Sequence, residues 1–261
     1  MSGVTYVGHA TLLLEIDGAR ILTDPNFDQR LAAMLPRVSC PGIPLGQLGE
    51  LDAVLVTHAH ADHLSLDSVR RLQGGAPFYA PPAVARWLRR HGHGNVTPLA
   101  PGDSVTVRGV EVTALAARHV GARYGIDRWR GASNMYLVES ARFAALFAGD
   151  TGLACDVWSR MSQRFRATNR SLDVALLPIG HAPWWKRPLF RRGHLTPSDA
   201  LDAFERLEAR YFVPYHWGTF RHLTSTPFAA MMELRRRLEG HSRKSDVVIL
   251  EPGSTFALPA Q

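Results

Sequence analysis

Short apolar runs, several of them rich in β-branched or aromatic residues, alternate along this chain with longer amphipathic stretches. Runs of this length that are bounded by turn residues are typical of β-strands. The predicted strands lie at 4–7, 11–16, 20–23, 53–57, 105–107, 110–117, 134–139, 143–148, 173–178, 211–214 and 247–250. Helices are expected in the intervals between them, so the fold class is α/β.

Three of the expected helices have a recognisable start or apolar face. Ser65 is a good N-cap for a helix through Arg71, because its hydroxyl can accept a hydrogen bond from a free backbone amide. The segment 196–199 (TPSD) opens a second helix, with apolar residues at helical spacing up to Leu207. A third helix is predicted at 227–238.

The chain shows no sign of division into separate domains. Its 261 residues can bury one large core, and turn residues gather in short clusters at 36–49 and 74–82. Both halves alternate strands with helices, which is in keeping with two βα units that face each other across a cleft. We therefore predict a single domain over residues 1–261.

The segment 58–63 (HAHADH) follows directly on the apolar run 53–56. On an extended backbone, alternate side chains share a face, so His58 and His60 can point at one metal ion. A turn would then offer Asp62 and His63 to a second ion. Imidazoles and carboxylates suit zinc, and packed without a cation the imidazoles would only lower one another's proton affinity. The segment therefore predicts half of a two-metal site.

Three further candidates follow other predicted strands, namely His119, Asp150 and His216. Ligands of α/β proteins gather beyond the carboxyl ends of strands, where side chains on neighbouring loops converge. Each residue taken alone would be an ordinary turn or structural residue. Beside the first cluster, we expect them to complete the two coordination shells.

Several of these segments carry a resemblance to a known family. The segments 57–65 (THAHADHLS), 147–152 (FAGDTG) and 214–220 (PYHWGTF) resemble the metallo-β-lactamase superfamily, in the branch of N-acylphosphatidylethanolamine-hydrolysing phospholipase D and the ascorbate-6-phosphate lactonases. The similarity also covers 6–11 (YVGHAT), 22–25 (LTDP), 177–180 (LPIG) and 194–197 (HLTP). The resemblance implies a four-layer αββα sandwich, with two β-sheets flanked by helices.

The resemblance also implies a role for each candidate ligand. One zinc ion would be held by His58, His60 and His119, and the other by Asp62, His63 and His216, with Asp150 bridging both. A hydroxide shared by the two ions would be the nucleophile, and manganese or iron could replace zinc. Classical class B β-lactamases lack the bridging Asp, so antibiotic hydrolysis is disfavoured.

Asp62, Asp150 and His194 are the predicted catalytic residues. The counterpart of His194 in the phospholipase branch lies close to the active site, so His194 could donate a proton to the leaving group or to a phosphoryl oxygen. His9 could orient a ligand. His181 is either a loop histidine or a substrate contact, and both alternatives stay open.

The net charge of +7 favours an anionic small-molecule substrate. Aromatic and cationic residues alternate at 184–192 (WWKRPLFRR), beside the expected cleft. This segment could be a lid, an anion clamp, or an ordinary loop with its aromatic side chains packed inward. A membrane-surface contact is the least favoured alternative.

We expect a dinuclear zinc hydrolase of the phosphodiesterase type, acting on phosphodiesters or other anionic esters. One alternative is a lactonase acting on a sugar-phosphate lactone, as in the sister branch. Another is a non-catalytic metal-binding module, which would normally have lost a ligand, whereas none is missing here. No specific nucleic acid partner is expected, because the extra motifs of the superfamily's nucleases are absent.

The predicted location is the cytoplasm. No basic region precedes an apolar segment at the N-terminus, and no apolar run reaches the roughly 18 residues of a membrane span. The phospholipase has a long extension before its first catalytic strand, whereas the first predicted strand here begins at Val4, so membrane contact is not expected. Homo-oligomerisation stays open. Cys40 and Cys155 are expected to be buried free thiols.

Overall fold

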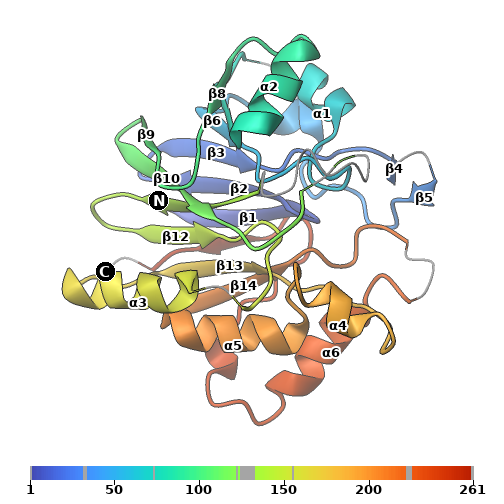
Figure 1. Cartoon of the computed structure of the whole chain (residues 1–261), viewed down its shortest axis with the longest axis vertical. Helices are drawn as coiled ribbons and strands as arrows, with labels where there is room; N and C mark the ends of the chain where they lie inside the picture. Colours follow the sequence, from blue (N-terminus) through green and yellow to red (C-terminus); the bar gives the residue numbers. More distant parts are fainter. Residues whose placement is uncertain are drawn as a thin grey trace.

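Two β-sheets lie face to face between two layers of helices in the computed structural model (Figure 1). It describes residues 2–31, 34–72, 74–121, 123, 133–154, 156–221 and 225–259. This arrangement is the predicted αββα sandwich.

The strands form two large sheets and one small ribbon. The first sheet has the order β15 (Thr255–Ala257), β1 (Gly3–Gly8), β2 (Thr11–Ile16), β3 (Ala19–Thr23), β6 (Ala53–Leu55), β7 (Phe78–Ala80) and β8 (Val96–Pro98). The second has the order β14 (Tyr211–Tyr215), β13 (Val174–Pro178), β12 (Ala144–Phe147), β11 (Asn134–Glu139), β10 (Val110–Ala116) and β9 (Ser104–Val107). A small ribbon pairs β4 (Arg30–Leu31) with β5 (Leu35–Pro36).

Helices cover the outer face of each sheet (Figure 1). Those beside the first sheet are α1 (Leu66–Arg71) and α2 (Pro82–Arg90). Those beside the second are α3 (Val157–Ala167), α5 (Pro197–Leu207) and α6 (Ala229–Leu238), and the short α4 (Arg187–Phe190) lies near them. Two 3₁₀ turns, Leu45–Gln47 and Lys244–Asp246, complete the helical elements of the described residues.

The first sheet is buried on both faces, which explains its continuous apolar strands. Val4 and Tyr6 of β1 pack in the core that this sheet shares with the second sheet. Val7 and Leu13 point to the opposite side and pack with α1 and α2. Because successive side chains of a strand alternate between faces, a sheet covered on both sides needs apolar residues at every position.

The predicted helix starts are confirmed in detail. The Ser68 amide donates a hydrogen bond to the Ser65 hydroxyl at the start of α1 (3.0 Å). At the start of α5, Thr196 and Asp199 cap each other's backbone amides in a capping box. The third predicted helix is present as α6, beginning at Ala229.

One predicted strand is wrong, and others were missed. The segment 247–250 makes only an isolated bridge from Val247 to Phe212, and β15 supplies the last strand instead. The segment 74–82 contains β7, because burial of Phe78 and Tyr79 in the first sheet outweighs the flanking Gly and Pro residues. The other predicted strands are present, within two residues at each end.

Two further expectations concern the burial of the cysteine thiols and the presence of a membrane-spanning segment. The Cys40 thiol is exposed rather than buried, because it lies in the loop after β5, and Cys155 lies outside the described residues. Among the described helices, none is long and apolar enough to cross a bilayer.

Candidate metal centre

Every candidate ligand lies just beyond the carboxyl end of a strand or in the turn that follows. His58 comes soon after β6, and His119, Asp150 and His216 follow β10, β12 and β14. Three of these strands belong to the second sheet and one to the first, so the site lies at the end of the sandwich to which the carboxyl ends of these strands point. The fold thus brings together residues that are far apart in the sequence.

The first group of ligand atoms comes from His58, His60, His119 and Asp150. His60 Nδ1 lies 2.9 Å from His58 Nε2 and 3.1 Å from His119 Nε2. Asp150 Oδ2 lies 3.9 Å from His58 Nε2 and 4.0 Å from His119 Nε2. Donor atoms around one tetrahedral zinc ion lie roughly 3.3 Å apart, so the spacing suits a single ion.

The second group comes from Asp62, His63 and His216. Asp62 Oδ2 lies 3.8 Å from His63 Nε2 and 3.4 Å from His216 Nε2. Asp150 also reaches this group, with Oδ2 at 3.3 Å from His63 Nε2 and Oδ1 at 3.6 Å from His216 Nε2. Asp150 therefore faces both groups, as a bridging carboxylate would.

Three buried atoms of this cluster have no hydrogen-bond partner among the described residues, namely His63 Nε2, His216 Nε2 and Asp150 Oδ1. A buried polar atom without a partner costs about 1–3 kcal/mol. One cation between the two imidazoles and the carboxylate would satisfy all three atoms. The donor set thus fits the metal that the resemblance implies.

Hydrogen bonds on the outer side of two imidazoles determine which nitrogen faces the cluster. His63 Nδ1–H donates to Asp24 Oδ2 (2.7 Å), and His119 Nδ1–H donates to the Gly193 carbonyl (2.7 Å). A carboxylate and a carbonyl can only accept, so the proton is on Nδ1 and the lone pair of Nε2 points inward.

Asp24 orients a second imidazole, that of His58, through Thr57, and we did not predict this role from the sequence. The Thr57 hydroxyl donates to Asp24 Oδ2 (2.6 Å) and accepts from His58 Nδ1–H (2.9 Å), while the Thr57 amide donates to Asp24 Oδ1 (2.7 Å). Asp24 is fully buried, and its φ of 34° lies in the left-handed region. An acidic residue directly after a predicted strand was the available signal, since Asp150 has the same context.

His9 lies where it can orient the second group. Its Nε2 is 3.0 Å from Asp62 Oδ2, and its ring centre is 3.9 Å from that of His216. His9 is buried and has a φ of 56°. His9 thus contacts the same Asp62 oxygen that faces His63 and His216, and it belongs to the same group of possible ligand atoms, a position from which it can orient Asp62.

His194 lies beside the first group, and His181 does not enter either one. His194 Nε2 is 3.5 Å from Asp150 Oδ2, and its ring stacks on Phe190 at 4.4 Å between centres. Burial lowers the pKa of His194 from its ordinary value, although Asp150 opposes this effect. The buried Nδ1 of His181 has no hydrogen-bond partner among the described residues.

The pKa directions of His58 and Asp150 match the forms that metals bind, whereas those of His63 and His216 do not. Burial alone would lower the pKa of His63 and of His216, but the nearby Asp150 outweighs it and raises both, so a bound metal would displace a proton from each imidazole. Burial lowers the pKa of His58 well below its ordinary value, and the nearby His63 and His119 lower it further. Burial alone would raise the pKa of Asp150, but His216 and His63 outweigh it and hold the pKa well below its usual range. His58 is therefore neutral and Asp150 ionised at neutral pH.

Gly149 allows the loop of Asp150 to approach the first sheet. Its φ is 55°, and a Cβ at this position would lie 2.7 Å from Thr57 Cβ. Only glycine combines this conformation with so close a contact. The Gly-Asp pair therefore places Asp150 against the Thr57 and Asp24 network from the other sheet.

A cavity of about 830 Å³ opens beside the first group. It is lined by His60, Ala117, Arg118, His119, Val120, Lys186, Leu189, Phe190, Arg192, Gly193 and His194. The segment 184–192 thus forms part of the wall, as expected for a residue run beside the cleft. A cavity of this size can hold a small organic substrate.

The side chains of segment 184–192 have different surroundings. Trp184 and Trp185 are 83% and 62% exposed, so the alternative in which the aromatic side chains of the segment pack inward is wrong for both. Arg191 pairs with the buried carboxylate of Asp199, and Arg187 lies 3.7 Å from Glu233. Lys186 and Arg192 are the cations of this segment that line the cavity.

Comparisons with known proteins agree with this geometry. The model of a family described as "Beta-lactamase superfamily domain" matches residues 19–217. A UPF0173 metal-dependent hydrolase of Methanopyrus kandleri is 31% identical over 257 residues, which cover 97% of this chain and 98% of that protein. The N-acyl-phosphatidylethanolamine-hydrolyzing phospholipase D 1 of Caenorhabditis elegans is 31% identical over 83% of this chain.

The match with the Caenorhabditis elegans enzyme spans 64% of that longer protein. Among solved structures, the isothiocyanate hydrolase from Delia radicum gut bacteria has a TM-score of 0.80 and covers 100% of both chains at 21% identity. The similarity to this structure concerns the fold.

Proposed function

This chain belongs to the metallo-β-lactamase superfamily and is a metal-dependent hydrolase, and from that premise we propose that it works with two zinc ions on phosphodiesters or other anionic esters. The position of Asp150 between the two ligand groups is the observation that carries the proposal. In it, His58, His60 and His119 would hold one ion, Asp62, His63 and His216 would hold the other, and Asp150 would serve both. Manganese or iron would suit the same ligands.

Two ions held in this way would activate a water molecule and polarise a carbonyl or phosphoryl oxygen. The protein's own side chains would orient the metal ligands and supply a proton to the leaving group. His9 and Asp24 fix the ligands through the contacts described above. His194, whose Nε2 lies beside Asp150 at the cavity wall, would give a proton to the leaving oxygen from its protonated form, which burial disfavours and Asp150 favours.

The substrate class is supported by the charge of the cavity. Arg118, Lys186 and Arg192 line it, and cations at a cavity wall attract anionic substrates. The Caenorhabditis elegans relative is named for a phospholipid substrate, and such lipids are phosphodiesters. A lactonase is the alternative, because two metal ions can also polarise the carbonyl of a lactone, and a neutral lactone needs no cation at the cavity wall.

Neutralising the cavity cations tests which substrate class is used. Lys186→Gln and Arg192→Gln should each raise KM for bis(4-nitrophenyl) phosphate by up to about fivefold at low salt, because each removes one attractive charge. The rise should shrink at 0.15 M salt, and KM for a neutral lactone should change little. Initial rates over a range of substrate and salt concentrations give these values.

Arg187→Gln is the matched control, because it removes one charge from the same segment but from outside the cavity wall. Its KM for the diester should stay within about twofold of the wild-type value. Equal effects of Lys186→Gln on charged and neutral substrates would contradict binding of the substrate's anionic group by the cavity cations. The lactonase would then become the leading function.

We also propose that residues 1–261 form one hydrolase domain with a small-molecule substrate. The two sheets share one core, in which Val4 and Tyr6 of the first sheet pack with Val112 and Tyr136 of the second. A core shared in this way does not divide into two independent units.

A further inference from the structure

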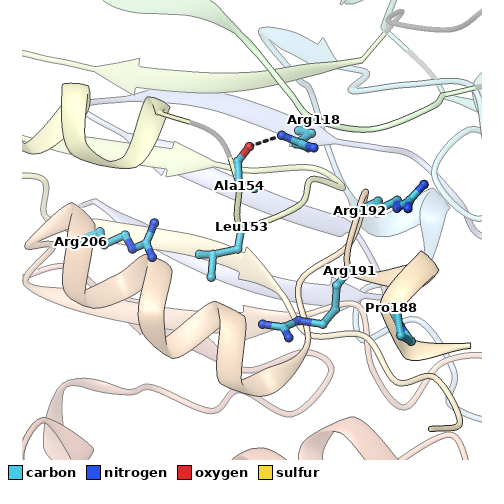
Figure 2. A pocket seen from close by; sticks show the side chains of 7 residues that line it. All are labelled: Arg118, Leu153, Ala154, Pro188, Arg191, Arg192 and Arg206. Carbon is cyan, nitrogen blue, oxygen red and sulfur yellow. Dashed lines mark hydrogen bonds between the residues drawn. The ribbon is translucent and has the colours of Figure 1, made fainter. Parts of the chain in front are cut away.

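A second hollow, whose lining includes four arginines, lies beside the cavity of about 830 Å³, which we call the catalytic cavity. Figure 2 shows the residues that line this hollow. Its volume is about 390 Å³. Its walls are formed by Arg118, Leu153, Ala154, Pro188, Arg191, Arg192 and Arg206. Figure 2 shows Leu153 in the middle, Arg206 of α5 on one side, and Arg191, Arg192 and Pro188 on the other. None of the described residues that line it is acidic.

The positive charge of this hollow is only partly neutralised. Arg191 is paired with Asp199, whose Oδ2 accepts from Arg191 Nε at 2.9 Å. Arg118 Nη1 donates to the Ala154 carbonyl (2.6 Å), which is a neutral acceptor. The side chains of Arg192 and Arg206 make no hydrogen bond or ion pair with the described residues. Four guanidinium groups therefore lie near two carboxylates, Asp199, which is paired with Arg191, and Asp202, whose charge also acts on Arg191.

Cations held together in this way favour an anionic ligand. Their mutual repulsion is unfavourable unless a counter-ion binds between them. The guanidinium group presents a planar set of donors that matches the oxygens of a phosphate group. Leu153, Ala154 and Pro188 form an apolar surface between the arginines, and the four arginine side chains are exposed, so a ligand can enter the hollow directly from solvent. The chemistry therefore points to a phosphate-type dianion.

The hollow and the catalytic cavity share part of their walls. Arg118 and Arg192 line both. The Gly152 amide donates to the Arg118 carbonyl (3.0 Å), and a Cβ on Gly152 would lie 2.7 Å from the Arg192 carbonyl oxygen. The segments that carry Asp150, His119 and the arginines are thus packed directly against one another.

We propose that this hollow binds a phosphate group of the substrate that is not the reacting group, while the scissile bond lies at the metal centre. The substrate would be an ester or diester that carries a second, remote dianion. This inference rests on the proposed hydrolase function for the position of the scissile bond. The affinity of the hollow for phosphate does not depend on turnover.

Arg206 is the best residue for a test, because it lines the hollow and is not part of the catalytic cavity. Calorimetric titration of the zinc-loaded protein with glycerol 3-phosphate should show a binding event that Arg206→Ala weakens roughly tenfold. The event should also weaken as salt increases. Arg236→Ala is the matched control, because Arg236 is an exposed arginine of α6 outside both cavities. Equal affinities in the two variants would overturn the site.

A pair of substrates tests whether the bound phosphate belongs to the substrate. Arg206→Ala should raise KM for a 4-nitrophenyl ester that carries a remote phosphate roughly tenfold more than KM for the same ester without it. Equal changes in both KM values, with phosphate binding still dependent on Arg206, would overturn the substrate assignment and indicate free phosphate as the ligand.

Asp150→Asn separates this inference from the proposed function. If the hollow is an anion site, this variant should still bind glycerol 3-phosphate with a dependence on Arg206. Retained hydrolysis by Asp150→Asn would overturn the proposed function and leave the phosphate site standing. Hydrolysis that depends on Asp150, together with phosphate binding that does not depend on Arg206, would overturn the phosphate site alone.

Discussion

Asp150→Asn should lower kcat by about three orders of magnitude or more, while the protein remains folded. The substitution keeps the shape of the side chain but removes the negative charge that faces both ligand groups. One amide oxygen cannot serve two ions as a carboxylate can, so the charge and spacing of the centre would both change. Initial rates and circular dichroism of the metal-loaded variant give the two quantities.

Asp173→Asn is the matched control for this experiment. Asp173 is a buried carboxylate just before β13, at the opposite end of the second sheet from the candidate metal centre, and it accepts hydrogen bonds from the Ala144 amide and from Arg210. Its replacement should reduce stability but leave kcat within about twofold. Full activity of Asp150→Asn with unchanged metal content would show that Asp150 does not bridge.

Asp24→Asn should weaken metal binding by about 10- to 100-fold, although Asp24 is not itself expected to hold an ion. The carboxylate accepts from Thr57 through both oxygens and from His63 Nδ1 through Oδ2. An amide replaces one acceptor with an NH₂ donor, which would face other donors. Asn tolerates the left-handed backbone at this position, so the main loss should be in the orientation of the imidazoles.

Competition with a chromophoric chelator measures this effect. The metal affinity of Asp24→Asn should fall, whereas that of Asp173→Asn should stay close to the wild-type value. Equal affinities in wild type and Asp24→Asn would mean that the Asp24 hydrogen bonds do not orient the ligands. The loss in Asp24→Asn should be accompanied by lower activity at limiting zinc, which added zinc restores.

The candidate ligands could be predicted because each carries a local signal. The run from His58 to His63 has metal-binding spacing in itself, and His119, Asp150 and His216 directly follow apolar strands. The two sheets were likewise visible, because their strands are long enough for burial to show as an apolar run. The short strands β4, β5, β7, β8 and β15 were not, since two or three residues carry too little pattern.

Apart from His9, the supporting residues could not be predicted, because their roles depend on contacts over long distances in the sequence. Asp24 meets His63 only after β3 and β6 pair in the first sheet. The sequence of segment 184–192 suggests one basic unit. In the fold, however, Arg191 pairs with Asp199, whereas Lys186 and Arg192 line the cavity. Arg206 joins Arg118 and Arg192 only in three dimensions.

The metal content of the purified protein tests the central claim most directly. Protein expressed with ample zinc, freed of loose metal by dialysis and measured by elemental analysis, should contain about two zinc ions per chain, because the proposed ligands form one group around His60 and another around Asp62. Iron or manganese at the same ratio would change the identity of the metal and keep the two-ion centre. A reproducible value near one ion or none per chain would contradict it.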